Sequence, residues 1–192
     1  MTPTAQAPKH ARIYPGLLDS NVEFFKNGND LKVISNGSIF DFKDLPPIIY
    51  NIISELLNSE KPAKKILEKW FPKSETKQLK KFTECRFGAL DFTPDISNAI
   101  LQDGEYWDCP KRGSCEGEGI VCKNIKYQGV ELTTQDIDLM KLLVTNDTNN
   151  VIAEKHQVSF GQLHKLKKNL YAKTNSQTRQ CIGNVIAKLN IL

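Results

Sequence analysis

The sequence predicts a mainly α-helical protein with a small α+β N-terminal part and a C-terminal four-helix helix-turn-helix domain, joined by a cysteine-rich connector. Three observations lead to this fold class. Apolar residues recur every three or four positions through the last third of the chain, which is the spacing of a buried helix face. A turn signal, Asn36-Gly37, separates two short runs of strand-forming residues. Three cysteines and three glycines lie between residues 109 and 122, where neither pattern continues.

The domain organisation follows from these changes in composition. The first sixteen residues are polar and hold three of the nine prolines, which predicts a disordered tail. The chain as a whole is 40% hydrophobic and 25% charged, without a long apolar run or an apolar leader, so we expect a cytoplasmic protein without a membrane contact. The predicted boundaries are the tail over 1–16, an α+β domain over 17–100, the connector over 101–128 and the helix-turn-helix domain over 129–192.

The N-terminal domain begins with a predicted β-hairpin. Leu31–Ser35 and Ser38–Phe42 are its strands, and Asn36-Gly37 favours a type I′ turn because both residues tolerate positive φ. Apolar spacing, with prolines at the starts and stops, predicts three helices over 46–58, 62–71 and 74–87. Their lysines could contact nucleic acid, although interspersed glutamates favour a solvated outer face. The apolar face of the first helix is predicted to hold Ile48, Ile49, Ile52, Ile53, Leu56 and Leu57.

The connector carries a candidate metal site. Cys109, Cys115 and Cys122 are separated by five and six residues, and 23 residues lie between Cys85 and Cys109. Four thiolates complete a tetrahedral site, and cytosolic cysteines stay reduced, which favours a metal over disulfides. Zinc is the favoured ion, and an iron–sulfur cluster is the alternative, since these gaps are longer than those of zinc knuckles. Four unligated thiols are the alternative to a metal site. Cys181 is excluded, because its place on the last helix indicates an ordinary small buried residue.

Two helix start signals stand out in the C-terminal third. Thr133 and Asp136 have the spacing of a capping box, and so do Ser159 and Gln162. In each pair the first side chain accepts a backbone N–H three residues on, and the second reaches back to the first residue's N–H. A helix is therefore expected to begin at each position.

The second of these helices follows a short helix and a tight turn. Val151–Ala153 form the apolar face of the short helix, the turn falls at Gln157-Val158, and Asn175 ends the longer helix, since Asn tolerates the left-handed conformation. This arrangement describes a helix-turn-helix. Apolar residues from four helices are predicted to share one core: Ile137, Met140, Leu143, Ile152, Leu163, Leu166, Leu170, Ile182, Val185, Ile186 and Leu189.

Several short pieces of the last third carry a family resemblance: Leu132-Thr133, Leu142-Leu143, Ile152-Ala153-Glu154, Val158-Ser159, Asn169-Leu170-Tyr171, Lys173 and Arg179. Through these pieces, residues 132–192 resemble the C-terminal DNA-binding domain of LuxR-type transcription regulators. The sequence departs from that family where it usually has glycine, near Asn146 and at Gln157, and where it usually has valine, near Gln162–Leu163. It also carries Gly161 within the first turn of the longer helix.

The resemblance implies that the helix beginning at Phe160 enters the major groove of double-stranded DNA. Gln162 and His164 are then the expected base readers, with Lys165 and Lys168 beside them. The phosphate backbone is expected to be held by Asn149, Lys167, Lys173 and Arg179. Charge agrees with a polyanionic partner, because residues 151–192 carry a net +6 while the other 150 residues sum to −2.

Two function classes follow from these patterns. The first is a sequence-specific DNA-binding transcription regulator with a structural or sensory four-cysteine metal site, possible contact with RNA polymerase and a possible homodimeric state. The alternative is a non-enzymatic adaptor, part of RNA polymerase, a phage or another mobile element, that uses the helix-turn-helix as a docking scaffold. No phosphate-binding loop and no nucleophile–base pair are evident, so we do not expect an enzyme.

Overall fold

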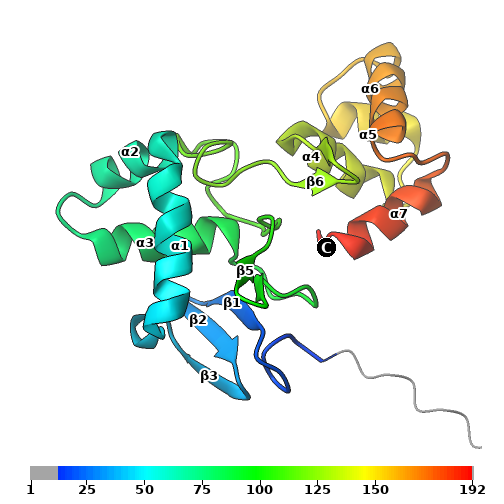
Figure 1. Ribbon diagram of the computed structural model, residues 1–192. Coiled ribbons are helices and arrows are strands. Elements are labelled where there is room, and N and C mark those ends of the chain that lie inside the picture. Colours follow the sequence, from blue (N-terminus) through cyan, green and yellow to red (C-terminus); the bar gives the residue numbers. More distant parts are fainter. Residues whose placement is uncertain (1–12, 192) are drawn as a thin grey trace, which may run out of the picture.

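The computed structural model describes residues 13–191, so most of the predicted tail over 1–16 lies outside the described residues. The described chain has seven α-helices and a five-stranded antiparallel sheet on its N-terminal side, a mixed α and β protein. Figure 1 shows α1–α3 beside the sheet and α4–α7 on the other side of the connecting loop. None of the helices within the described residues is both long and apolar enough to cross a membrane.

The sheet has the strand order β3-β2-β1-β4-β5. The predicted hairpin is confirmed, and Asn36 and Gly37 take φ values of 49° and 76°, as its turn requires. The first strand was not predicted, because its sequence Val-Glu-Phe-Phe-Lys-Asn does not alternate and it buries Glu23 completely. The strands are β1 (Val22–Asn27), β2 (Asp30–Ser35), β3 (Ser38–Asp41), β4 (Ile96–Ser97) and β5 (Ile100–Leu101).

Three helices pack against this sheet, within one or two residues of their predicted bounds: α1 (Pro47–Ser59), α2 (Lys61–Trp70) and α3 (Glu75–Arg86). With the sheet they enclose the first hydrophobic core, in which Phe24, Leu67 and Phe82 are fully buried. The predicted apolar face of α1 is wrong at Ile48, which is 64% exposed. The helix begins with Ile48 in its first turn, outside the stripe of Ile49, Ile53 and Leu57 that faces the core.

Four further helices enclose a second core: α4 (Thr134–Leu143), α5 (Asn149–Lys155), α6 (Phe160–Lys173) and α7 (Arg179–Lys188). Every residue predicted to share this core lies in it, although Leu166 and Leu189 are only partly buried. Both predicted capping boxes are present, at the starts of α4 and α6. Val151 was wrongly placed on the apolar face of α5. It is 36% exposed, whereas Ile152 and Ala153 are buried.

Two non-glycine residues take the left-handed conformation at the ends of these helices. Asn175, after α6, has a φ of 48°, as predicted, and Gln157, after α5, has a φ of 55°. Glycine adopts this conformation without steric cost, whereas a side chain such as that of Gln157 makes it unfavourable. The backbone at Gln157 therefore makes the same turn that glycine would allow, but with some conformational strain.

The connector passes between the two cores. Tyr106 and Ile125 are buried in the second core, whereas Val121 and Cys122 pack in the first. A small two-stranded pair, β6 (Lys126–Tyr127) and β7 (Val130–Glu131), leads into α4. The loop from Trp107 to Lys123 is consequently held by both halves of the described chain.

Candidate functional site

The exposed side of α6 gathers most of the residues predicted to bind DNA. Phe160, Gln162, His164, Lys165 and Lys168 are all exposed. They begin at the helix start, which the Ser159–Gln162 capping box fixes with hydrogen bonds of 3.2 and 2.9 Å. The rings of Phe160 and His164, one turn apart, make an edge-to-face contact with centroids 4.7 Å apart. This side of α6 is thus polar and basic, with one aromatic pair.

The capping box also limits what Gln162 can do. Its Oε1 accepts the backbone N–H of Ser159, which occupies one lone pair of that oxygen and turns it towards the helix start. Bidentate pairing with adenine needs both the oxygen and the nitrogen of the amide. Gln162 would therefore have to leave the cap in order to make that pair.

Asn149, Lys167 and Arg179 come together from three different helices. The Asn149 Oδ1 accepts hydrogen bonds from Lys167 Nζ at 3.1 Å and from Arg179 Nη2 at 2.6 Å. Arg179 Nη1 also donates to the carbonyl of Asp147 at 2.8 Å, which orients its guanidinium. Burial and the Arg179 charge lower the pKa of Lys167. Two cations share one neutral oxygen, an arrangement that an added anion would stabilise.

Lys173 lies in a different environment. Its ammonium is 2.6 Å from the Asp136 carboxylate of α4. A phosphate would have to compete with that carboxylate, whereas it would find Lys165 and Lys168 exposed. Lys173 therefore joins two helices in the described chain.

All four cysteines predicted to bind metal line one cavity of about 400 Å³. Cys85 comes from the C-terminal turn of α3, and Cys109, Cys115 and Cys122 come from the connector loop. None of them forms a disulfide. Burial raises the pKa of the Cys85 thiol to about 12. Cys181 is distant in the chain, on α7, and is half-buried rather than buried as predicted.

No three of the four cysteine sulfurs in the described chain lie within 4.8 Å of one another. Among the described residues, the group of potential metal-ligand atoms that lie within 4.8 Å of one another consists of carboxylates from Glu23, Asp91 and Glu105. The cysteine sulfurs do not form such a group. Aromatic side chains and cations complete the cavity wall: Trp70, Phe71, Trp107, Lys81, Lys111 and Arg112.

The carboxylate group was not predicted. Glu23 accepts the Asp91 backbone N–H through Oε1 at 2.9 Å, while its Oε2 is buried without a hydrogen-bond partner in the described chain. Burial raises the pKa of Glu23 to about 8, and burial with the charges of Asp91 and Glu23 raises the pKa of Glu105 to about 10. These residues come from a strand and two loops, so sequence spacing does not reveal them. The only local indication of this carboxylate group is a glutamate, Glu23, within the apolar strand β1.

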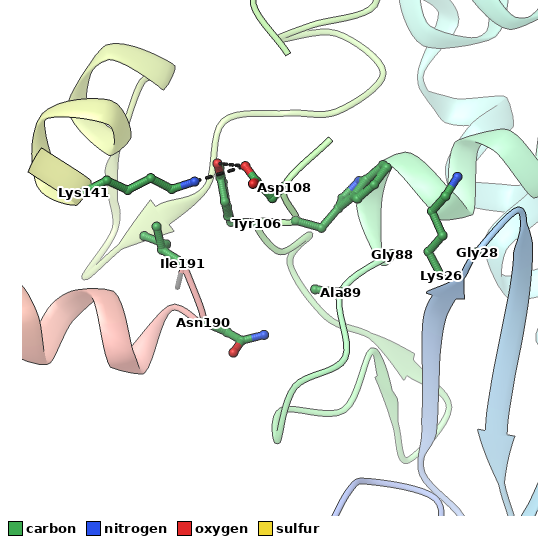
Figure 2. Close-up of a pocket in the computed structure, with 10 residues that line it drawn as sticks. Lys26, Gly28, Gly88, Ala89, Tyr106, Asp108, Lys141, Asn190 and Ile191 are labelled. Carbon is green, nitrogen blue, oxygen red and sulfur yellow. Dashed lines mark hydrogen bonds and ion pairs between the residues drawn. The ribbon is translucent and has the colours of Figure 1, made fainter. Parts of the chain in front are cut away.

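Two contacts tie the cysteine loop to α4. Glu118 accepts a hydrogen bond of 2.6 Å from the Thr134 hydroxyl, and Asp108 forms an ion pair of 3.0 Å with Lys141. Figure 2 shows Lys141 reaching from α4 to Asp108 and Tyr106 across a second cavity of about 520 Å³. Asn190, which also lines that cavity, donates to the Leu90 carbonyl at 3.2 Å.

Comparison with known protein families, curated proteins and solved structures finds no match for this chain.

Proposed function

We propose that the chain is a sequence-specific DNA-binding transcription regulator and that α4–α7 are its helix-turn-helix DNA-binding domain. One observation carries this proposal. The exposed polar and basic side of α6 lies beside the Asn149–Lys167–Arg179 group, so the residues that we propose to read bases and to bind phosphates lie close together.

In this proposal α6 enters the major groove with its first turns facing the base edges. His164 and the amide N–H groups of Gln162 face the bases, with Lys165 and Lys168 beside them. Lys167 and Arg179 bind a backbone phosphate, which replaces their shared contact with the Asn149 oxygen. Phosphate contacts set the orientation of the helix, and base contacts supply the sequence preference.

A second candidate function is a protein-docking adaptor, with RNA polymerase or a phage or mobile-element component as partner. It is favoured by Phe160, which is 49% exposed at the start of α6, and by Val151 on neighbouring α5. Exposed apolar residues of this kind suit a protein contact. A protein adaptor, however, gives no reason for the positive charge to gather on the same surface.

Binding of the full chain to random duplex DNA, followed by fluorescence anisotropy over a range of salt, tests the proposal. The slope of log affinity against log salt should be steep and negative, because bound phosphates release counterions. Lys165→Ala/Lys168→Ala should reduce that slope by about two units if both side chains contact phosphates. The matched control is Lys65→Ala/Lys77→Ala, which removes two exposed lysines from α2 and α3.

Selection from the same random pool identifies the site. Two half-sites about 34 Å apart would indicate a homodimer on DNA. If the control variant lost DNA binding while the α6 variant kept it, the DNA-binding surface would lie in the N-terminal half. If neither the wild-type protein nor any variant bound duplex DNA at low salt, the adaptor would be the better account.

A further inference from the structure

We propose that Cys85, Cys109, Cys115 and Cys122 bind an iron–sulfur cluster rather than a single zinc ion, and that this cluster holds the connector loop against α4. We also infer that the cluster thereby affects DNA binding, and this part rests on the proposed function. The first part, the identity of the metal centre, does not.

The spacing of the sulfur atoms carries the choice between the two metals. A zinc ion with bonds of about 2.3 Å to four sulfurs places every pair of them about 3.8 Å apart. The four cysteines line one cavity, yet no three of their sulfurs lie within 4.8 Å of one another in the described chain. A cluster distributes its four thiolates over different iron atoms, so their sulfurs stand farther apart.

The size of the cavity agrees with this choice. Its volume of about 400 Å³ exceeds what one ion needs, since a sphere with the radius of one zinc–sulfur bond encloses about 50 Å³. Gly117 packs against Trp70 so closely that a Cβ atom there would lie 2.6 Å from the ring, which keeps the loop folded round the cavity. An iron–sulfur core, with its own sulfide ions, needs more room than one zinc ion, and this cavity provides it.

Two residues that line the cavity, Trp107 and Arg112, each have a side-chain N–H group without an acceptor in the described chain. Trp107 Nε1 and Arg112 Nε are both buried without a hydrogen-bond partner in the described chain. A buried N–H group without an acceptor costs free energy. The sulfide and thiolate sulfurs of a cluster accept such hydrogen bonds, which are among the interactions that set its reduction potential. Lys81, Lys111 and Arg112 also offset the negative charge of four thiolates.

Two residues close to the cysteines in sequence hold the loop from Trp107 to Lys123 against α4. Asp108, next to Cys109, pairs with Lys141, and Glu118, between Cys115 and Cys122, binds Thr134. From α4, Asp136 continues to Lys173 on α6. When the cluster is lost, the loop moves and its two contacts with α4 break. The position of α4 is then less well fixed, and so is that of α6, which α4 holds through Asp136 and Lys173.

Metal and sulfide analysis of the full chain, purified without oxygen, tests the identity of the centre. We expect a brown protein with iron and acid-labile sulfide in equal numbers, two or four of each per chain. Changing any one of the four cysteines to serine should remove most of the iron, whereas Cys181→Ser on α7 should retain it. A colourless protein with one zinc per chain, or one without metal, would overturn the proposal.

Because a cysteine variant can fail to fold, Trp107→Phe and Arg112→Gln provide a second measurement. Trp107→Phe removes one buried N–H donor, Arg112→Gln removes a donor together with its positive charge, and both leave the four thiols in place. The cluster should persist in both variants with a lower reduction potential, since fewer hydrogen bonds then stabilise its reduced, more negative form. An unchanged potential in both variants would contradict the assignment of these donors to the cluster.

The coupling to α4 is tested by DNA affinity before and after removal of the cluster with a chelator and an oxidant. We expect depletion to weaken binding by about fivefold or more. In Thr134→Val, which removes the hydroxyl donor to Glu118, this dependence should shrink while the iron content stays unchanged. The matched control is Gln135→Ala, an exposed neighbour on α4. Equal affinity with and without the cluster would exclude the coupling, and iron content separates that outcome from a failure of DNA binding itself.

Discussion

The carboxylate of Asp136 and the ammonium of Lys173 lie 2.6 Å apart and join the first turn of α4 to the last turn of α6. Asp136 also accepts the backbone N–H of Thr133 at 2.8 Å, which closes the α4 capping box. One side chain therefore stabilises the start of α4 and fixes the position of α6. The sequence revealed the cap, because it depends on residues three apart, but not the partner 37 residues away.

Asp136→Asn should lower the free energy of unfolding by about 1–2 kcal/mol, since it weakens a helix cap and removes a partly buried ion pair. Burial raises the pKa of Asp136, but the Lys173 and Thr133 hydrogen bonds outweigh it and leave that pKa below its usual value. Its contribution to stability is thus present above the ordinary value of 3.8 and is lost as the pH falls through the lowered pKa. Urea denaturation measures the change. Asp138→Asn, an exposed aspartate on the same helix, is the control and should have little effect.

Leu163→Ala should destabilise the chain by about 2–5 kcal/mol, because this side chain is fully buried in the second core and its loss leaves a cavity. Leu166→Ala should cost less, since Leu166 is only partly buried on the same helix. Thermal or chemical unfolding of the pair measures both values. Equal losses at the two positions would mean that the register of α6 is wrong.

Glu23 and Glu105 should make the free energy of unfolding fall as the pH rises. Their pKa values are raised to about 8 and about 10, from an ordinary 4.5, so the folded chain keeps protons that the unfolded chain has released. The contribution of these two groups to stability is therefore fully present below pH 4.5 and is lost as the pH rises through their raised pKa values. Chemical denaturation at about pH 5 and about pH 8 measures this slope.

Glu23→Gln provides the control for that slope. The amide cannot ionise, so the decline between the same two pH values should be smaller in this variant than in the wild type. An identical decline would show that Glu23 does not hold its proton. Stabilisation of the wild type by added Ca²⁺ at the higher pH would show that the carboxylates bind a cation in place of protons.

Gly161→Ala should raise the free energy of unfolding by about 0.5–1 kcal/mol, because alanine favours a helix and a Cβ atom here would meet nothing within 4 Å. In the proposed complex the same methyl group would meet DNA, so the affinity for the selected site should fall. Gly183→Ala on α7 is the matched control, since its Cβ atom would make an ordinary contact with Val144 at 3.7 Å. If Gly161→Ala bound DNA as tightly as the wild type, the first turn of α6 would not approach the duplex closely.

Sequence reasoning succeeded where the determining interactions are local. Asn36-Gly37 specifies a two-residue turn, and the Thr133 and Ser159 caps act over three residues, so all of them were predicted correctly. The strand β1 was missed because its buried Glu23 is stabilised by Asp91, far along the chain. The four cysteines were selected as a set, but their spacing round the cavity depends on how the connector passes between two cores.

Because the connector packs in both cores, the protein cannot be divided into fragments at the end of the predicted N-terminal domain. Val121 is fully buried in the first core, and the Arg86 guanidinium binds the carbonyls of Ile120 and Val121 as well as the Glu60 carboxylate. A fragment ending at residue 100 would leave a hole where Val121 packs and an arginine without its carbonyl acceptors. A stable N-terminal fragment should therefore extend through Lys123, whose ammonium also binds Glu60. Such a fragment retains all four cysteines, so its iron content can be measured in the absence of α4–α7.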